Sequence, residues 1–233
     1  MPDAHILLDA LGQPVPGHLD ASAGKGHPGV VVLHEYWGLN DQTRAFCGRL
    51  AAQGFVVFAP DLYGGRLATT ADEASTLMKG LQREQVVHLV TRATAALKSV
   101  QLGARVGVMG FCMGGALALY TASRIPGLNA CVPFYGIPAA GEADYSAIRG
   151  RVQGHYANED AHVTPERVDA LEKDLTRMGV EHTLFRYEAQ HAFMNETRPE
   201  VYDPRAAAEA FDRAVAFLHA ELDGHGPPPG AQR

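Results

Sequence analysis

The sequence predicts a single α/β domain, in which helices cover both faces of one mostly parallel sheet. Short apolar segments rich in valine alternate along the chain with longer segments whose apolar residues recur at helical spacing. Such alternation is typical of parallel sheets, because a crossover must separate two parallel strands. The 233 residues, 46% of them hydrophobic, can bury the core of such a domain. Since no repeat or interdomain linker is visible, we expect one domain over residues 1–223 and a disordered tail over 224–233.

The first half of the chain contains three predicted strands and two predicted helices. Asp41 is expected to cap a helix that ends at Gly54, because Phe46, Leu50 and Ala51 share one face between them. The polar stretch rich in Thr and Ala after "PDLYGGR" carries no helical prediction. The strands are expected at 29–33, 55–59 and 106–109, and the second helix at about 84–100.

The second half continues the alternation. Cys112 is expected to open a helix directly after the 106–109 strand. Thr164 and Pro165 mark the start of another helix, which Gly179 ends, and a last helix begins near Pro204. Between these helices, strands are expected at 130–134, 151–155 and 182–187.

Composition and charge narrow the functional classes. The net charge is −6 and no basic run is interleaved with aromatic residues, so nucleic acid is not expected as a partner. We find neither a secretory signal nor an apolar run long enough for a bilayer, so the expected location is the cytoplasm and no membrane partner is expected. Three cysteines at no metal-ligand spacing are expected to be free thiols. A monomer or a small homo-oligomer is expected.

Reactive side chains follow several of the predicted strands. Glu35 comes after the first strand, Cys112 after the central one, Asp160 shortly after the 151–155 strand and His191 after the last. Ligands of open parallel sheets bind outside the carboxyl ends of the strands, where these four residues are expected to meet.

The spacing Gly110-x-Cys112-x-Gly114 predicts a nucleophile on a sharp turn from strand to helix. Such a turn brings its neighbours two residues away against adjacent backbone, so these positions must be small. It leaves the first helical amides free, so the amide of Met113 can bind an oxyanion, and it favours the thiolate. The chain order Cys112, Asp160, His191 is the order of nucleophile, acid and histidine that accompanies such a turn.

Alternatives remain open for several of these residues. Cys112 could be a small buried side chain, the role that we expect for Cys47 and Cys131. Glu159 and Asp144 compete with Asp160 for the acid position, since any of these carboxylates can cap a turn. Glu35 could pair with an arginine, Trp37 could be part of the core, and Arg83 could be a solvated helix residue.

A metal site is not expected. His34-Glu35 begins like the zinc-binding pattern H-E-x-x-H, but Gly38 stands where the second histidine belongs. His155, Asp160 and His162 could converge on zinc, yet the glycines around Cys112 would then have no explanation.

Six segments together resemble the dienelactone hydrolase family (carboxymethylenebutenolidases) over about residues 28–220. They are "HEYWGLN", "PDLYGGR", "GFCMGGALAL", "PFYGIP", "NEDAHVTPE" and "YEAQHAFMNETRPEVYDP". The resemblance implies an α/β-hydrolase fold, a triad of Cys112, His191 and Asp160, and no cofactor. It further implies that Glu35 helps to generate the thiolate when substrate binds, and that the amides of Tyr36 and Met113 form the oxyanion hole.

The match to the family is incomplete in the substrate-binding segments. The resemblance implies two arginines that hold a substrate carboxylate; Arg83 matches the first, but Asn195 occupies the second position. A neutral amide cannot replace a bidentate guanidinium, although Arg198 is a candidate to compensate. Val87 and Val90 also stand where aromatic residues are expected. Arg83, Trp37 and Asn195 are accordingly the candidates for substrate contact.

The resulting hypothesis is a cysteine-dependent hydrolase of a small lactone or ester that works through an acyl-enzyme. Two alternatives remain. One is a carboxylesterase or thioesterase for neutral short-chain substrates, and the other is a non-catalytic relative that binds a ligand or senses oxidants through Cys112. The sequence leaves open whether Glu35 or His191 deprotonates Cys112.

Overall fold

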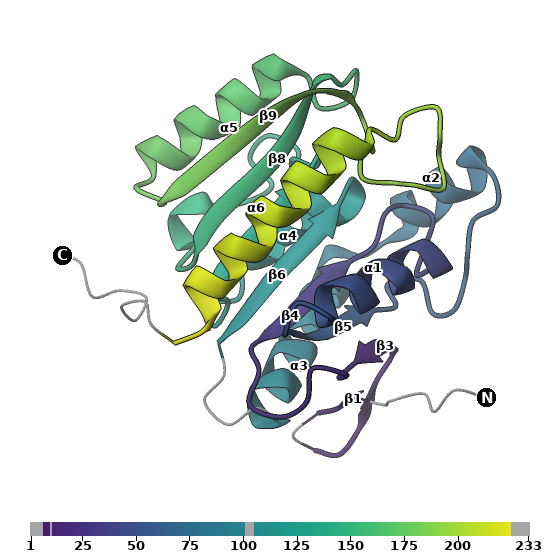
Figure 1. The fold of residues 1–233 in the computed structure, drawn as a ribbon, viewed down its shortest axis with the longest axis vertical. Helices are drawn as coiled ribbons and strands as arrows, with labels where there is room; N and C mark the ends of the chain where they lie inside the picture. Colours follow the sequence, from purple (N-terminus) through teal and green to yellow (C-terminus); the bar gives the residue numbers. More distant parts are fainter. Residues whose placement is uncertain (1–6, 10, 101–104, 225–233) are drawn as a thin grey trace.

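The computed structural model describes residues 7–9, 11–100 and 105–224, and its centre is a twisted, mostly parallel sheet (Figure 1). Within these residues the sheet has seven strands in the order β3-β5-β4-β6-β7-β8-β9, and β3 alone runs antiparallel to its neighbour. The strands are β3 (Gly17–Asp20), β4 (Gly29–Leu33), β5 (Val56–Pro60), β6 (Val106–Phe111), β7 (Ala130–Phe134), β8 (Arg151–Glu159) and β9 (His182–Gln190). A separate small hairpin joins β1 (Leu7–Leu8) and β2 (Pro14–Val15).

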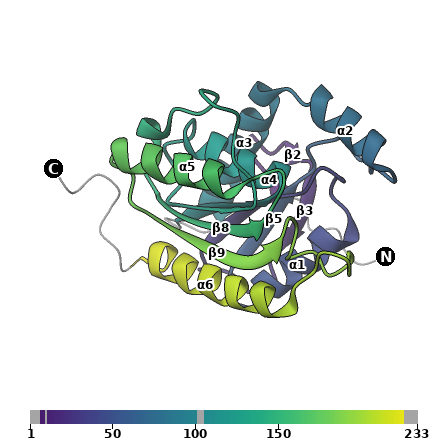
Figure 2. The ribbon, with the colours of Figure 1, turned by 90° about the horizontal axis from the view of Figure 1, so that it is seen from above.

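Helices cover both faces of the sheet, as the sequence predicts. Figure 2 shows α1 (Asp41–Ala51) and α6 (Pro204–Leu222) on one face. The other face carries α3 (Arg83–Val100), α4 (Met113–Ala122) and α5 (Pro165–Arg177). The predicted tail lies outside the described residues apart from Gly224.

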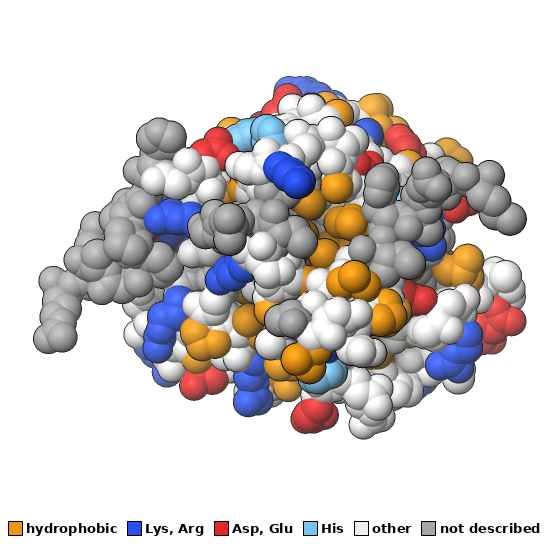
Figure 3. Space-filling view, turned by 90° about the horizontal axis from the view of Figure 1, so that it is seen from below, with side chains coloured by type: hydrophobic (Ala, Val, Ile, Leu, Met, Phe, Trp, Pro, Cys, Tyr) orange, Lys and Arg blue, Asp and Glu red, His pale blue; other side chains and the backbone are white. Residues whose placement is uncertain are grey.

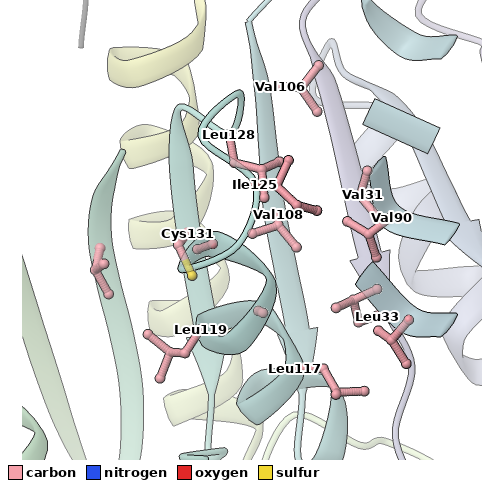
Figure 4. Packing of buried hydrophobic residues seen from close by; sticks show 14 of the residues in the cluster. Val31, Leu33, Val90, Val106, Val108, Leu117, Leu119, Ile125, Leu128 and Cys131 are labelled. Atoms are coloured by element: carbon pink, nitrogen blue, oxygen red, sulfur yellow. The ribbon is translucent and has the colours of Figure 1, made fainter. Parts of the chain in front are cut away.

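The two layers of helices enclose two apolar clusters, one on each face of the sheet. Figure 4 shows part of the cluster on the side of α3 and α4, where Val90 lies near Val31 of β4. Strands β4, β5, β6 and β7 are buried along their whole length. This double burial explains their continuous apolar sequences, because both sides of such a strand face a core.

Several elements differ from the prediction. Helix α2 (Ala71–Gly80) is an additional helix that a capping box at Thr70 starts, and only Ala74 of it is buried. The side chain that caps α1 is Asn40, which accepts from the amide of Thr43, so the assignment of Asp41 as the cap was wrong. Asp41 is instead the first helical residue. Strands β8 and β9 both extend further toward their carboxyl ends than predicted.

The carboxyl ends of the parallel strands lie at the top of Figure 1, and Figure 3 views the opposite side. In that view hydrophobic side chains gather near the middle and charged side chains of both signs lie around them. Among the described helices, none combines the length and the apolar character that crossing a bilayer requires.

A buried histidine links β8 to β9. His155 is fully buried; its Nδ1 lies 2.8 Å from the hydroxyl of Tyr187 and its Nε2 lies 3.1 Å from Oε1 of Gln153. Its ring stacks on Phe134 with 4.5 Å between centroids. Burial, assisted by the charge of Arg213, lowers the pKa of His155 to about 3. The neutral ring is therefore the form that the fold stabilises.

We expect this histidine to make stability depend on pH. Its folded pKa is below the unfolded value of about 6.5, so the unfolded chain binds one more proton between the two values and stability falls with falling pH. Going from about pH 7.5 to about pH 5.5, the wild type should lose about 1.4 kcal/mol more than His155→Phe in urea unfolding. The control variant His88→Gln, which changes an exposed histidine, should show the same pH dependence of stability as the wild type. Equal pH dependence in wild type and His155→Phe would contradict the assignment.

Candidate active site

Cys112 stands on a sharp turn between β6 and α4. Its backbone has a φ of 53°, a conformation that costs energy for any residue other than glycine. An added Cβ at Gly110 would overlap the carbonyl of Gly114, and one at Gly114 would overlap the carbonyl of Leu33. The two glycines thus allow the helix to start directly against β4, and the strained turn presents the thiol at the carboxyl edge of the sheet.

Three side chains form a hydrogen-bonded chain at this edge. Nε2 of His191 lies 3.2 Å from Sγ of Cys112, and Nδ1 of the same ring lies 2.6 Å from Oδ2 of Asp160. The other carboxylate oxygen of Asp160 accepts from the amides of His162, at 2.7 Å, and Val163, at 2.8 Å. These bonds fix the carboxylate, which in turn orients the imidazole.

The two other candidates for the acid position lie in different surroundings. Asp144 accepts from the amide of Ser146 at 3.1 Å and so caps a short 3-10 helix over Tyr145–Ala147. Glu159 is exposed at the end of β8.

The hydrogen bonds and charges around His191 favour its protonated form. Burial alone lowers the pKa of His191, but its hydrogen bonds to Asp160 and Cys112 outweigh burial and raise the pKa to about 10. For Asp160, burial raises the pKa, but the hydrogen bonds from His191, Val163 and His162 and the charge of His191 together outweigh burial and leave the pKa lowered. An imidazolium next to sulfur stabilises a thiolate.

Glu35 is buried at the wall of the same cavity, where two neighbours hold its carboxyl group. The hydroxyl of Tyr135 donates to Oε1 at 3.1 Å, and the amide of Asn195 donates to Oε2 at 2.9 Å. Burial raises the pKa of Glu35, and these two hydrogen bonds only partly oppose that rise.

Two backbone amides are available near the thiol. Tyr36 and Met113 both line the cavity that contains Cys112. Met113 is the first residue of α4, so its amide has no acceptor within the helix. Within the part of the chain that the structure describes, the amide of Tyr36 donates to no acceptor.

The cavity has a volume of about 490 Å³ and is mainly apolar. Its cationic side chains include Arg167 and Arg198, both of which already have partners. Arg167 donates to the carbonyl oxygens of His162 and Ile137, and Arg198 pairs with Glu200 at 2.8 Å. The apolar lining includes Met78, Met113, Ala116, Ile137 and Val163.

The three residues predicted to contact substrate do not line this cavity. The guanidinium of Arg83 pairs with Glu142 at 2.5 Å, and Trp37 packs against Tyr36 with 4.6 Å between ring centroids. Asn195 is 1% exposed, and its amide donates to Glu35. Each of these side chains therefore has a partner within the protein.

Sequence reasoning missed other residues of the site. Tyr135, which follows β7 in "PFYGIP", has a φ of 36° and contacts both Glu35 and His191. Its position after a strand was the available signal. The ring of His162 also lies 5.2 Å from that of His191. His155, the remaining residue of the zinc alternative, bonds to Tyr187 and Gln153, and we find no group of three metal-ligating side chains in the part of the chain that is described.

Comparisons of sequence and of structure relate the chain to known proteins. The sequence model of the dienelactone hydrolase family matches residues 16–222. The chain is 38% identical to "Protein usf" of Aquifex pyrophilus, with 93% of this chain and 98% of that protein covered. It is 34% identical, at the same coverage, to a protein of Aquifex aeolicus named "Putative carboxymethylenebutenolidase". Among solved structures, a dienelactone hydrolase-like promiscuous phosphotriesterase from metagenomic libraries is similar with a TM-score of 0.79 and 26% identity, covering 88% of this chain and 92% of that one.

Proposed function

Because the chain belongs to the dienelactone hydrolase family and is an ester-bond hydrolase, we propose that it cleaves a small ester or lactone through a thioester formed on Cys112. The observation that carries this proposal is the unbroken chain from the sulfur of Cys112 through His191 to Asp160, with distances of 3.2 and 2.6 Å. A binding protein or a redox sensor would not need an imidazole that a carboxylate orients toward the thiol.

In the first half of the proposed reaction, the thiolate of Cys112 attacks the carbonyl carbon of the substrate. The carbonyl oxygen becomes an oxyanion, which accepts hydrogen bonds from the amides of Tyr36 and Met113. As the tetrahedral species collapses, the carbon–oxygen bond breaks and His191 gives its proton to the leaving oxygen. The products are an alcohol, or the opened end of a lactone, and a thioester on Cys112.

In the second half, neutral His191 takes a proton from water, and the resulting hydroxide attacks the thioester. Collapse of this second tetrahedral species breaks the carbon–sulfur bond, releases the acid and restores the pair of thiolate and imidazolium. Asp160 stabilises the imidazolium in both halves without becoming protonated.

We assign the deprotonation of Cys112 to His191. The ring nitrogen is within hydrogen-bonding distance of the sulfur, whereas both carboxyl oxygens of Glu35 are engaged by Tyr135 and Asn195. Glu35 in this scheme supports the cavity wall and anchors those two side chains.

The variant Asp160→Asn tests the triad. Asn cannot stabilise an imidazolium and favours the wrong tautomer of His191, so kcat for p-nitrophenyl acetate should fall by a factor of about 10³ to 10⁴. The matched control is Glu159→Gln, which changes the adjacent exposed carboxylate and should leave kcat within about twofold of the wild type. Comparable kcat values for Asp160→Asn and the wild type would refute the role of Asp160.

Neither of the two expected carboxylate-binding positions lines the cavity. The resemblance places carboxylate-binding arginines at positions 83 and 195. The guanidinium of Arg83 pairs with Glu142, and the buried side-chain amide of Asn195 donates to Glu35. We therefore infer a preference for neutral short-chain esters over a carboxylated lactone.

The expected result is a kcat/KM for p-nitrophenyl acetate that equals or exceeds that for a dienelactone. Because Arg198 lines the cavity, Arg198→Met should further lower the lactone value about tenfold by removing a charge that can attract its carboxylate, and should leave the neutral ester within about twofold. A lactone preference of about 10² or more in the wild type would contradict the neutral-ester assignment.

A further inference from the structure

His34 is a buried polar residue that the proposed mechanism does not use. It follows β4, is 0% exposed, and is absent from the lining of the cavity. Both of its ring nitrogens nevertheless have partners in the backbone. Nδ1 lies 2.6 Å from the carbonyl oxygen of Glu35, and the amide of Leu62 donates to Nε2 at 3.3 Å.

These two contacts determine which ring nitrogen carries the proton. A backbone amide can only donate, so Nε2 must be the unprotonated acceptor. Nδ1 then carries the hydrogen and donates it to the carbonyl of Glu35. Burial lowers the pKa of His34, which keeps the ring in this neutral form.

The carbonyl of Glu35 and the amide of Tyr36 belong to the same peptide group. A trans peptide is planar, so its C=O and N–H point in opposite directions and any bond that fixes one also aims the other. The Glu35 oxygen accepts a second hydrogen bond, from the amide of Gly38 at 3.2 Å. Two donors thus hold this peptide plane, and they also polarise its N–H toward stronger donation.

We propose that His34 is a positioning residue that aims and polarises the Tyr36 amide as an oxyanion donor. This inference rests on the proposed acyl-transfer function, because only a developing oxyanion needs that amide. His34 touches neither the substrate nor the reacting atoms; it acts through the peptide that joins Glu35 to Tyr36.

The surrounding contacts support a role at the oxyanion hole. The ring of Tyr63 lies 5.1 Å from that of His34, and its hydroxyl lies 3.2 Å from the sulfur of Met113. His34 therefore belongs to a cluster that connects the residues carrying both candidate amides.

Two conservative substitutions separate the functions of the ring nitrogens. In His34→Asn, the side-chain amide can occupy the place of Nδ1 and donate to the Glu35 carbonyl. In His34→Gln, the side-chain oxygen can replace Nε2 as acceptor for Leu62, but the donor to Glu35 is lost. We expect kcat for p-nitrophenyl acetate to fall about 10- to 100-fold in His34→Gln, with KM unchanged, and only about threefold in His34→Asn.

Alkylation of Cys112 by iodoacetamide distinguishes a specific loss at the oxyanion hole from a general structural defect, because only a general defect would also change the alkylation rate. The thiolate displaces iodide from a saturated carbon, so this reaction needs no oxyanion hole, and its rate should equal the wild-type rate in both variants. An unchanged kcat in His34→Gln, or parallel losses of kcat and alkylation, would overturn the proposal. If Cys112→Ala keeps full esterase activity, the proposed function itself fails; if it is inactive while His34→Gln is fully active, only the role of His34 fails.

A measurement on the wild-type protein keeps the proposal testable even if neither variant folds. Nitrogen-15 resonances of the histidine rings distinguish the two neutral tautomers. We expect His34 to be protonated on Nδ1, and protonation on Nε2 would overturn the inference.

Discussion

The variant Cys112→Ala is expected to lose ester hydrolysis, with kcat/KM lowered by a factor on the order of 10⁴ or more while the protein stays folded. Without the sulfur no covalent intermediate can form, and the remaining amides and His191 can only assist direct attack by water. Alanine is smaller than cysteine and places no new atom in the turn, so the strained φ of 53° at this position is tolerated as before. The measurement is steady-state hydrolysis of p-nitrophenyl acetate, with circular dichroism as the test of folding.

The matched control is Cys47→Ala. Cys47 is a buried thiol in α1, and burial raises its pKa to about 12, so it is neither accessible nor ionised. This variant should keep the wild-type kcat/KM and lose only about 1 kcal/mol of stability through a small cavity. Residual activity of Cys112→Ala within about tenfold of the wild type would remove the basis for a cysteine nucleophile.

The variant Gly114→Ala is expected to damage both folding and activity. Its new Cβ would overlap the carbonyl group of Leu33 and come close to the carbonyl oxygen of His34, and backbone atoms cannot move aside as a flexible side chain can. We expect a loss of at least about 3 kcal/mol in the free energy of unfolding. Any folded fraction should have a displaced Cys112 and a rate lowered on the order of 10² or more.

Gly80→Ala makes the same chemical change at the end of α2, where an added Cβ would meet nothing within 4 Å. It should change the free energy of unfolding by less than about 1 kcal/mol and leave turnover intact. Similar stabilities of the two variants in urea unfolding would contradict the claim that Gly114 is needed for the close contact between α4 and β4.

The sequence was sufficient where the determining interactions are local or follow from strand order. The strand-to-helix turn lies within the five residues from Gly110 to Gly114. Backbone atoms occupy the space that a Cβ would need at Gly110 and at Gly114. Asp160 and His191 follow neighbouring parallel strands, so sheet topology brings them together even though they are far from Cys112 in the chain. The α/β-hydrolase fold itself is confirmed.

The sequence was insufficient where a distant partner determines a side chain's role. Arg83 pairs with Glu142, 59 positions away, and Asn195 bonds to Glu35, 160 positions away. Neither pairing is visible as a pattern along the chain, so the sequence alone could not predict it. Helix α2 was missed although the sequence carries signals for it: Thr70 and Glu73 form a capping box, and Ala74, Leu77 and Met78 recur at helical spacing.

The central claim is that hydrolysis passes through a thioester on Cys112. The most direct test is to mix the wild-type protein with p-nitrophenyl acetate, quench with acid within milliseconds, and measure the mass of the intact protein and of its peptides. The account predicts a mass gain of one acetyl group, located on the peptide that contains Cys112 and absent from Cys112→Ala. An acetyl group on another residue that forms and decays at the rate of turnover, or full turnover in Cys112→Ala, would contradict it.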